Sequence, residues 1–214
     1  MKTHVYLENT QRDELPQAFK GDDVRFSESL VRHFLEEFTK PGDVVFDPFA
    51  GYGTTLVVSE ALGRVPFGIE FNKSKVEYAQ TKLQHPENLI HGDTRQLASY
   101  HLPSFNFSIT SPSYMNRSDI NDPLTGYSME GKGYEAYLED IRSIYGQLRQ
   151  QMKPRGTVVI EVANLKRGGE ITTLAWDIAR AVSQVLHFEG EVIVCWDKYG
   201  HGYDHSYGLV YSVK

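Results

Sequence analysis

Apolar and polar positions alternate along the chain with two different periods, which predict helices and strands in turn. Between Ser27 and Thr39 apolar residues recur at helical spacing, and Pro41-Gly42 ends this segment. Beyond it, short β-branched and aromatic runs alternate with further amphipathic segments. The predicted strands cover residues 44–46, 65–69, 88–91, 105–109, 157–162, 191–196 and 207–211, and the later helices cover 54–62, 72–83, 134–152 and about 171–186.

The order of these elements predicts an α/β fold. Strands that alternate with helices form a doubly wound, mostly parallel sheet with helices on both faces. The loop between the final two strands, 191–196 and 207–211, is too short to contain a crossover helix, so they are expected to form an antiparallel β-hairpin. We therefore expect a seven-stranded sheet that ends in this hairpin, preceded by an N-terminal arm at residues 1–25.

The composition is that of an ordinary globular domain of 214 residues, 40% of them hydrophobic, with a formal net charge of −6. The single cysteine, Cys195, excludes an internal disulfide framework and fits a reducing, cytoplasmic environment. No apolar run is long enough to span a membrane, and the N-terminus has no apolar segment typical of a secretory signal. The acidic balance counts against binding of nucleic acid through non-specific phosphate contacts alone, although a local basic patch or a basic partner stays possible.

A glycine-containing loop, FDPFAGYGTT from Phe46 to Thr55, follows the first strand after the Pro41-Gly42 turn. Gly51 and Gly53 allow a tight turn and the close approach of a ligand. The following helix N-terminus presents unpaired N–H groups to an electron-rich ligand. The loop lacks the third glycine of the dinucleotide fingerprint and the lysine of a P-loop, so phosphate binding is not expected.

Acidic residues follow the next two predicted strands. Glu70 ends the second strand, where doubly wound folds place an acid against ribose hydroxyls, and Asp93 follows the third. Either acid alone is equally consistent with a solvated strand end. Together with the glycine loop they outline a ligand site at the carboxyl ends of the strands. A nucleoside cofactor without a pyrophosphate suits this site better than a dinucleotide does.

The strand at 105–109 stops at the turn Thr110-Ser111-Pro112-Ser113-Tyr114. Serine and proline are common turn formers, so this stretch alone predicts nothing more than a turn. In combination with the upstream loop it carries a resemblance. DPFAGYGTT followed by TSPSY resembles the motifs D-P-F-x-G-x-G-T and [S/D/N]-P-P-Y of the S-adenosylmethionine-dependent DNA amino-methyltransferases, which modify cytosine N4 or adenine N6.

The resemblance extends from Phe26 to the terminal hairpin and implies a class I methyltransferase, Rossmann-like fold. Residues 26–214 would then form a single catalytic domain without a separate target-recognition domain. The family pattern is broken once, because Ser113 replaces its second proline.

The resemblance also implies which residues bind S-adenosylmethionine. It places Asp47 and the glycine loop at the methionine end, Glu70 at the ribose diol and Asp93 at the adenine amine. The segment Arg25 to Ser29 resembles the family's methionine-carboxylate motif, although Ser27 or Ser29 could instead cap the following helix. The expected cofactor-binding residues are Ser27, Ser29, Asp47, Pro48, Phe49, Ala50, Gly51, Gly53, Thr54, Glu70, Phe71 and Asp93, and no metal ligand is expected.

The chemistry of an exocyclic amine gives the turn a function. The nitrogen lone pair is delocalised into the ring, so hydrogen-bond acceptors aimed at the N–H groups localise it and stabilise the positive charge that develops during attack. The Ser111 hydroxyl and the Pro112 carbonyl are such acceptors, and Tyr114 offers a flat face for a base turned out of its stack. The expected catalytic residues are Ser111, Pro112, Ser113 and Tyr114. Methylation of cytosine C5 is excluded, because it needs a cysteine nucleophile and Cys195 lies in an apolar strand.

Family habit associates Ser111 with cytosine N4 rather than adenine N6. DNA is favoured over RNA, and we expect either a separate specificity subunit or a second copy of the chain as partner. One alternative is an RNA base N-methyltransferase with a similar turn. Another is a non-catalytic subunit that keeps the fold, but intact Asp47, Glu70 and Tyr114 argue against it.

Two loops are candidates for the target side of the site. The long polar loop from Met115 to Gly133 is expected to cover the base pocket. Its Arg117 and Lys132 either contact phosphates or are solvated loop charges. The loop 198–206 is expected to form an aromatic rim, while a metal site is the less favoured alternative there and would use Asp197, His201, Asp204 and His205.

Overall fold

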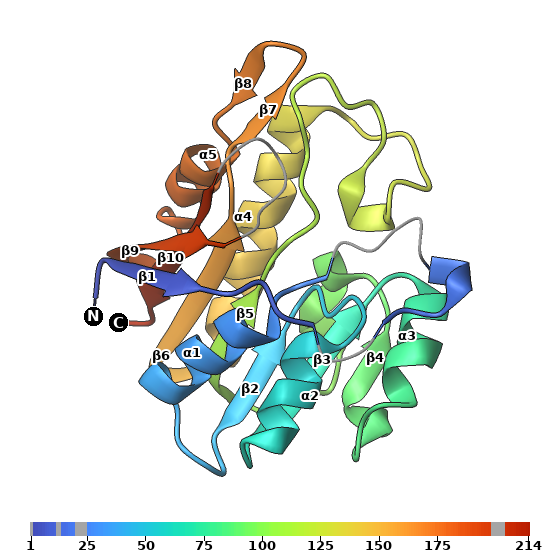
Figure 1. Ribbon diagram of the computed structural model, residues 1–214, viewed down its shortest axis with the longest axis vertical. Helices are drawn as coiled ribbons and strands as arrows, with labels where there is room; N and C mark the ends of the chain where they lie inside the picture. The colour runs from blue at the N-terminus through green and yellow to red at the C-terminus, as the bar shows by residue number, and fades with distance from the viewer. Residues whose placement is uncertain (1, 12–13, 20–24, 198–203) are drawn as a thin grey trace.

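The computed structural model describes residues 2–11, 14–19, 25–197 and 204–214 (Figure 1). Most of the loop 198–206, including His201, lies outside the described residues, and so does the proposed aromatic rim. Within the described ranges, no three His, Cys, Asp or Glu side chains are grouped so that they could hold a metal ion. No helix in the same ranges is both long and apolar enough to cross a membrane.

One mostly parallel sheet runs through the middle of the molecule. Its strand order is β1-β9-β10-β6-β5-β2-β3-β4. All neighbours pair in parallel except β10, which is antiparallel to both β6 and β9. This confirms the predicted doubly wound sheet whose last two strands form an antiparallel hairpin. The strands are β1 His4–Leu7, β2 Val44–Asp47, β3 Val65–Glu70, β4 Leu89–His91, β5 Phe105–Thr110, β6 Met152–Val162, β9 His187–Trp196 and β10 His205–Ser212.

The main sheet has eight strands rather than the seven predicted. Residues His4–Leu7 of the N-terminal arm form β1, which pairs in parallel with β9 from His4 opposite Ile193 to Leu7 opposite Trp196. A run of four residues is too short to be recognised from its own pattern. The edge of β9 supplies the backbone partners that make it a strand, and this edge belongs to the opposite end of the chain.

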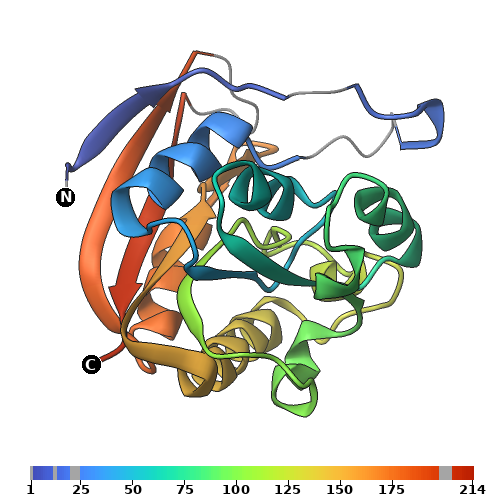
Figure 2. The same cartoon turned by 90° about the horizontal axis from the view of Figure 1, so that it is seen from below.

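Helices cover both faces of the sheet (Figure 2). Alternate residues of β6 point to opposite faces, with Val159 packing beneath α1 and Val158 and Ile160 packing against α4 and α5. Asn72 caps α3 as predicted, because its side chain accepts from the N–H groups of Ser74 and Lys75. The helices are α1 Glu28–Phe38, α2 Thr54–Ala61, α3 Lys73–Gln80, α4 Tyr134–Gln151 and α5 Leu174–Val182, with short 3₁₀ turns η1 Gln17–Phe19, η2 Pro86–Asn88, η3 Thr94–Ser99 and η4 Pro123–Thr125.

The prediction that the last helix begins near residue 171 was wrong. A separate antiparallel hairpin precedes α5, formed by β7 Leu165–Arg167 and β8 Glu170–Thr172, and it projects from the top of the molecule in Figure 1. Gly168 and Gly169 make its turn with φ of +60° and +85°. Two adjacent glycines between short runs favour a tight hairpin, and this local signal identifies the element.

Candidate functional site

A cavity of about 540 Å³ opens at the carboxyl ends of the central strands. Its size is that of an ordinary small-molecule site. It lies between the glycine loop after β2 and the loop after β5, so it joins the two motifs that are far apart in the sequence. The predicted site residues that line it are Ser27, Asp47, Pro48, Phe49, Ala50, Gly51, Thr54, Glu70, Phe71, Ser111, Pro112, Ser113 and Tyr114.

Three predicted site residues, Ser29, Gly53 and Asp93, do not line this cavity. Gly53 has a φ of +82°, and a Cβ there would come within 2.9 Å of the Ala79 Cβ. The second glycine of the loop is therefore required where α2 begins and packs against α3. Gly51, with φ +54°, provides the turn that faces the cavity.

Glu70 connects the glycine loop to the start of α3. One carboxylate oxygen accepts from the Gly51 N–H at 2.8 Å, and the other accepts from the Asn72 N–H at 2.7 Å. The carboxylate thus fixes the backbone on two sides of the cavity. Each oxygen keeps further lone-pair directions, so the same group can accept from ligand hydroxyls.

Asp47 is a buried acid of the site, with 2% of its surface exposed. One of its oxygens accepts from the Phe49 N–H at 2.9 Å and from the Thr110 hydroxyl at 2.6 Å. Burial raises the pKa of the Asp47 carboxyl to about 6, against the lowering effect of these hydrogen bonds, and the charge of Glu70 adds to the rise. A cationic ligand in the cavity would stabilise the ionised form of Asp47.

The Asp93 carboxylate, which the resemblance places at the adenine amine, is paired with Arg95 and is not part of the cavity lining. The carboxylate accepts from the backbone N–H of Arg95 at 2.9 Å, and the Arg95 guanidinium binds both oxygens at 2.7–3.0 Å. The Asp93 N–H donates to the Tyr100 hydroxyl at 3.0 Å. The neighbours Gly92 and Thr94, rather than the Asp93 side chain, border the cavity at this strand end.

Ser27 and Ser29 hold the N-terminal arm instead of capping α1. Neither side chain makes a capping hydrogen bond. The Ser27 hydroxyl accepts from the Thr10 N–H at 3.3 Å and contacts the Ser29 hydroxyl at 3.0 Å, while Ser29 donates to the Glu8 carbonyl at 2.6 Å. Ser27 borders the cavity together with Arg25, so the segment just before α1 contributes to its wall.

The turn Ser111 to Tyr114 leaves specific acceptors available. The Ser113 carbonyl accepts from the Tyr137 hydroxyl at 3.0 Å, and the Tyr114 carbonyl accepts from the Tyr127 hydroxyl at 2.7 Å. Within the described part of the chain, no group donates to the Pro112 carbonyl and none pairs with the Ser111 hydroxyl, and both residues line the cavity. The turn therefore presents two acceptors in a backbone that its neighbours hold in place.

Glu161, at the end of β6, was missed by the sequence reading. It is 4% exposed, lines the cavity, and accepts from the Tyr114 hydroxyl at 3.2 Å. The same hydroxyl accepts from the Ala163 N–H at 3.0 Å. A single acid inside the run VVIEV is a recognisable signal, because a carboxylate is rarely buried in an apolar strand without a function or a partner.

The loop from Met115 to Gly133, which was predicted to cover the base pocket, borders the cavity. It contributes Pro123, Leu124, Gly126 and Tyr127 to the lining. Of its two cations, Arg117 pairs with Asp177 at 3.0 Å. A second, smaller cavity shares Tyr114 with the first and continues between this loop and β7.

The fold is that of class I S-adenosylmethionine-dependent methyltransferases. TrmN from Thermus thermophilus superposes with a TM-score of 0.62 at 15% identity, covering 88% of this chain and 49% of TrmN. A TehB-like SAM-dependent methyltransferase from Corynebacterium glutamicum superposes with a TM-score of 0.59 at 14% identity, covering 92% of each chain. At these identities the likeness concerns the fold alone.

Sequence similarity is more specific in the first third of the chain. Residues 4–81 match the family model described as DNA methylase. The type II methyltransferase M.HinfI of Haemophilus influenzae is 40% identical over 65 residues, which are 30% of this chain and 18% of that enzyme. The type II methyltransferase M.Cfr9I of Citrobacter freundii is 44% identical over 59 residues, which are 28% of this chain and 20% of that enzyme.

These matches confirm the resemblance to the N4/N6 DNA amino-methyltransferases that the motifs indicated. The matched segment contains β2, the glycine loop and Glu70, which form the cofactor half of the expected site. The aligned segments span about a fifth of the length of the two type II enzymes.

Proposed function

We propose that this chain transfers a methyl group from S-adenosylmethionine to an exocyclic amine of a base in DNA. The observation that carries the proposal is that Ser111 and Pro112 line the same cavity as Asp47 and Glu70. Acceptors for an amine and acids for a cationic nucleoside thus border one space. The match to the DNA methylase family supports DNA as the substrate class.

The residues of the cavity fit this cofactor. Asp47 and Glu70 offer negative charge to a ligand that carries an ammonium and a sulfonium group, and Glu70 can accept from the ribose hydroxyls. Gly51 leaves room for close approach to the loop backbone. When bound, the cofactor supplies an electrophilic methyl group on sulfur.

The residues of the turn activate the amine. Ser111 and Pro112 accept from its N–H groups, which localises the nitrogen lone pair for attack. The backbone of the turn is held in place by Tyr127 and Tyr137, so the acceptors stabilise the charge that grows on nitrogen with little reorganisation of the chain. Asp47 and Glu70 would hold the cofactor, whose methyl group would pass from sulfur to the amine nitrogen, and the extra proton of the nitrogen would leave to solvent. Tyr114, held by Glu161 and Ala163, presents its ring to the base.

We further propose cytosine N4 as the target, on the basis of Ser111 in the first position of the motif, with adenine N6 as the alternative. Cys195 lies on β9 and does not line the cavity, so C5 methylation has no nucleophile there. We propose that sequence selection comes from a specificity subunit or from a second copy of the chain. RNA is the alternative substrate class.

Two experiments test the proposal in order. Calorimetric titration with S-adenosylhomocysteine, the demethylated product, is expected to show one binding site, and the absence of binding would contradict the cofactor assignment. Incubation with methyl-labelled cofactor and either methylation-free genomic DNA or total RNA then identifies the substrate. If label is found in RNA alone, RNA rather than DNA is the substrate class.

A further inference from the structure

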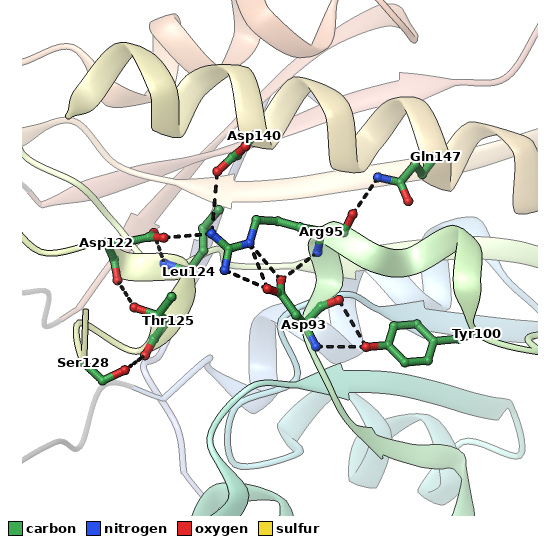
Figure 3. Close-up of polar contacts among 9 residues, drawn as sticks. All are labelled: Asp93, Arg95, Tyr100, Asp122, Leu124, Thr125, Ser128, Asp140 and Gln147. Atoms are coloured by element: carbon green, nitrogen blue, oxygen red, sulfur yellow. Dashed lines mark hydrogen bonds and ion pairs between the residues drawn. The ribbon is translucent and has the colours of Figure 1, made fainter. Parts of the chain in front are cut away.

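One arginine joins the strand end at β4 to the loop that covers the cavity (Figure 3). The Arg95 guanidinium binds the Asp93 carboxylate through Nε and Nη2, and it reaches Asp122 through Nη1 at 2.9 Å. Asp140 of α4 lies 3.8 Å from the same Nη1. Arg95 is thus surrounded by acids from three separate segments of the chain.

Arg95 is itself well fixed. It lies in η3, whose backbone is tied to α4 because the Arg95 carbonyl accepts from the Gln147 amide at 2.9 Å and the Ala98 N–H donates to the same side chain at 2.9 Å. The exposed fractions of the Arg95, Asp93 and Asp122 side chains are 30%, 19% and 15%. Charge-assisted hydrogen bonds in such partly buried positions are stronger and less screened than those on an open surface.

Asp122 organises the covering loop. One carboxylate oxygen of Asp122 binds Arg95. The other accepts from the Leu124 N–H at 2.8 Å and caps the turn η4. Its carbonyl accepts from the Tyr127 N–H at 3.1 Å, and its N–H donates to the Met129 carbonyl at 2.8 Å. The position of this one residue therefore sets the path of the loop from 120 to 129.

The same loop reaches the proposed catalytic turn. Leu124 and Tyr127 line the cavity, and the Tyr127 hydroxyl donates to the Tyr114 carbonyl at 2.7 Å. A continuous set of contacts thus connects five residues, Asp93, Arg95, Asp122, Tyr127 and Tyr114. It runs from the strand end beside Gly92 to the residue proposed to stack on the base.

We propose that Arg95 is a positioning residue that holds residues 120–129 over the target side of the cavity, and that its pairing with Asp122 serves binding of the nucleic acid rather than of the cofactor. This inference rests on the proposed function. It also explains why Asp93 is occupied by Arg95: the acid fixes the guanidinium so that Nη1 points to the loop. Lysine cannot replace Arg95, because a single ammonium group does not reach both carboxylates with this fork geometry.

Two substitutions separate this role from general stability. Asp122→Asn keeps an oxygen for the Leu124 N–H but removes the charge that faces Arg95, and Arg95→Lys keeps the charge but loses the fork. The matched control is Arg142→Lys, which weakens the exposed Arg142–Glu139 pair on α4, outside the loop. All variants and the wild type are first titrated with S-adenosylhomocysteine.

The measurements are limited trypsin digestion and steady-state methylation of methylation-free genomic DNA. Arg117 and Lys132 are exposed residues of the loop. Trypsin cleavage after them measures opening of the loop and does not depend on methylation activity. Both test variants are expected to be cleaved there about tenfold faster, and to raise KM for DNA about tenfold while kcat changes less than about threefold, since the loop positions substrate without reacting. Affinity for S-adenosylhomocysteine is expected to stay within about twofold of the wild type.

Unchanged cleavage and unchanged KM relative to the Arg142→Lys control would overturn the inference. Equal losses of cofactor and DNA affinity would overturn it as well, because they would assign Arg95 to the cofactor side. If the wild type binds no S-adenosylhomocysteine, the proposed function fails instead, and the digestion alone then decides whether Arg95 holds the loop.

Discussion

The Tyr114 hydroxyl donates to the buried carboxylate of Glu161 at 3.2 Å and accepts from the Ala163 N–H at 3.0 Å. The tyrosine of the catalytic turn is therefore anchored at its tip by the end of β6. Its carbonyl is held from the other side by Tyr127. A ring fixed at both ends is pre-organised as a platform for a base.

Tyr114→Phe removes the anchor and keeps the ring. The Ala163 N–H then loses its hydrogen-bond acceptor, and leaving one buried donor unpaired costs about 1–3 kcal/mol. We expect a free energy of unfolding lower by about this amount in urea denaturation. Glu161→Gln retains an acceptor for the hydroxyl, so its loss is expected to be smaller, and a larger loss in Glu161→Gln would show that the charge matters more than the hydrogen bond.

Tyr114→Ala removes the platform. Cofactor affinity is expected to stay nearly unchanged, while turnover falls tenfold or more, equivalent to the about 1–3 kcal/mol of one stacked base. Calorimetry with S-adenosylhomocysteine and single-turnover methylation measure the two quantities. A parallel loss of cofactor binding would move Tyr114 to the cofactor side of the cavity.

Ser111→Ala tests the acceptor side chain of the turn. Loss of one pre-organised hydrogen bond to the reacting amine is expected to reduce kcat about tenfold to a hundredfold. Ser113→Ala is the comparison, because it removes the other serine hydroxyl of the turn and leaves the hydrogen bond from Tyr137 to the Ser113 carbonyl intact. Equal kinetics in the two variants would remove Ser111 from the reaction.

Asp47→Asn tests the buried acid through pH. Folding raises the pKa of Asp47 from 3.8 to about 6, so it favours the neutral carboxyl. The resulting stabilisation is fully present below about pH 3.8 and is lost as the pH rises through about 6. The asparagine variant keeps an acceptor for Phe49 and Thr110 but does not titrate. Its free energy of unfolding relative to the wild type is expected to increase by about 2 kcal/mol between pH 4 and pH 7.

Titration of Asp47 is expected to affect cofactor affinity in the opposite direction to stability: affinity rises with pH, whereas this contribution to stability falls. The α-ammonium group of S-adenosylhomocysteine prefers the ionised carboxylate, so the affinity of the wild type for this ligand falls as the pH is lowered from 7 to 5, by up to about tenfold per unit. In Asp47→Asn this part of the pH dependence disappears. Parallel pH profiles of the two proteins would show that Asp47 does not face the ligand.

Gly53→Ala tests the packing of the glycine loop. The substitution combines a φ of +82° with a contact of 2.9 Å to the Ala79 Cβ. Gly42→Ala is the control, because it has a similar φ of +87° and no atom within 4 Å of the added Cβ. Gly53→Ala is expected to lose about 1–3 kcal/mol more stability than the control in thermal unfolding, the usual cost of overpacking. Similar losses of stability in the two variants would show that the positive φ alone, and not the contact with Ala79, requires glycine at position 53.

The features that sequence predicted are those encoded by neighbouring residues. The alternation of strands and helices, the Asn72 cap and the turn at Ser111 each depend on a few adjacent side chains. The place of the cavity could also be predicted, because parallel strands bring their carboxyl ends to one edge of the sheet wherever they lie in the chain.

The features that sequence did not predict depend on distant partners. Strand β1 requires the edge of β9, and Asp93 is diverted from the cavity by an arginine two positions away that also needs Asp122. Glu161 had a local signal, but its partner Tyr114 lies 47 residues earlier in the chain. In each case the tertiary contact, and not the local pattern, decides what the residue does.

The most direct test of the proposed activity is nucleoside analysis by mass spectrometry after incubation of the wild-type chain with methylation-free genomic DNA and isotopically labelled S-adenosylmethionine. Label in N4-methylcytosine, or in N6-methyladenine for the alternative base, is the predicted result. Label in 5-methylcytosine, or no label from protein that binds the cofactor, would contradict methyl transfer to an exocyclic amine of DNA by the Ser111–Tyr114 turn.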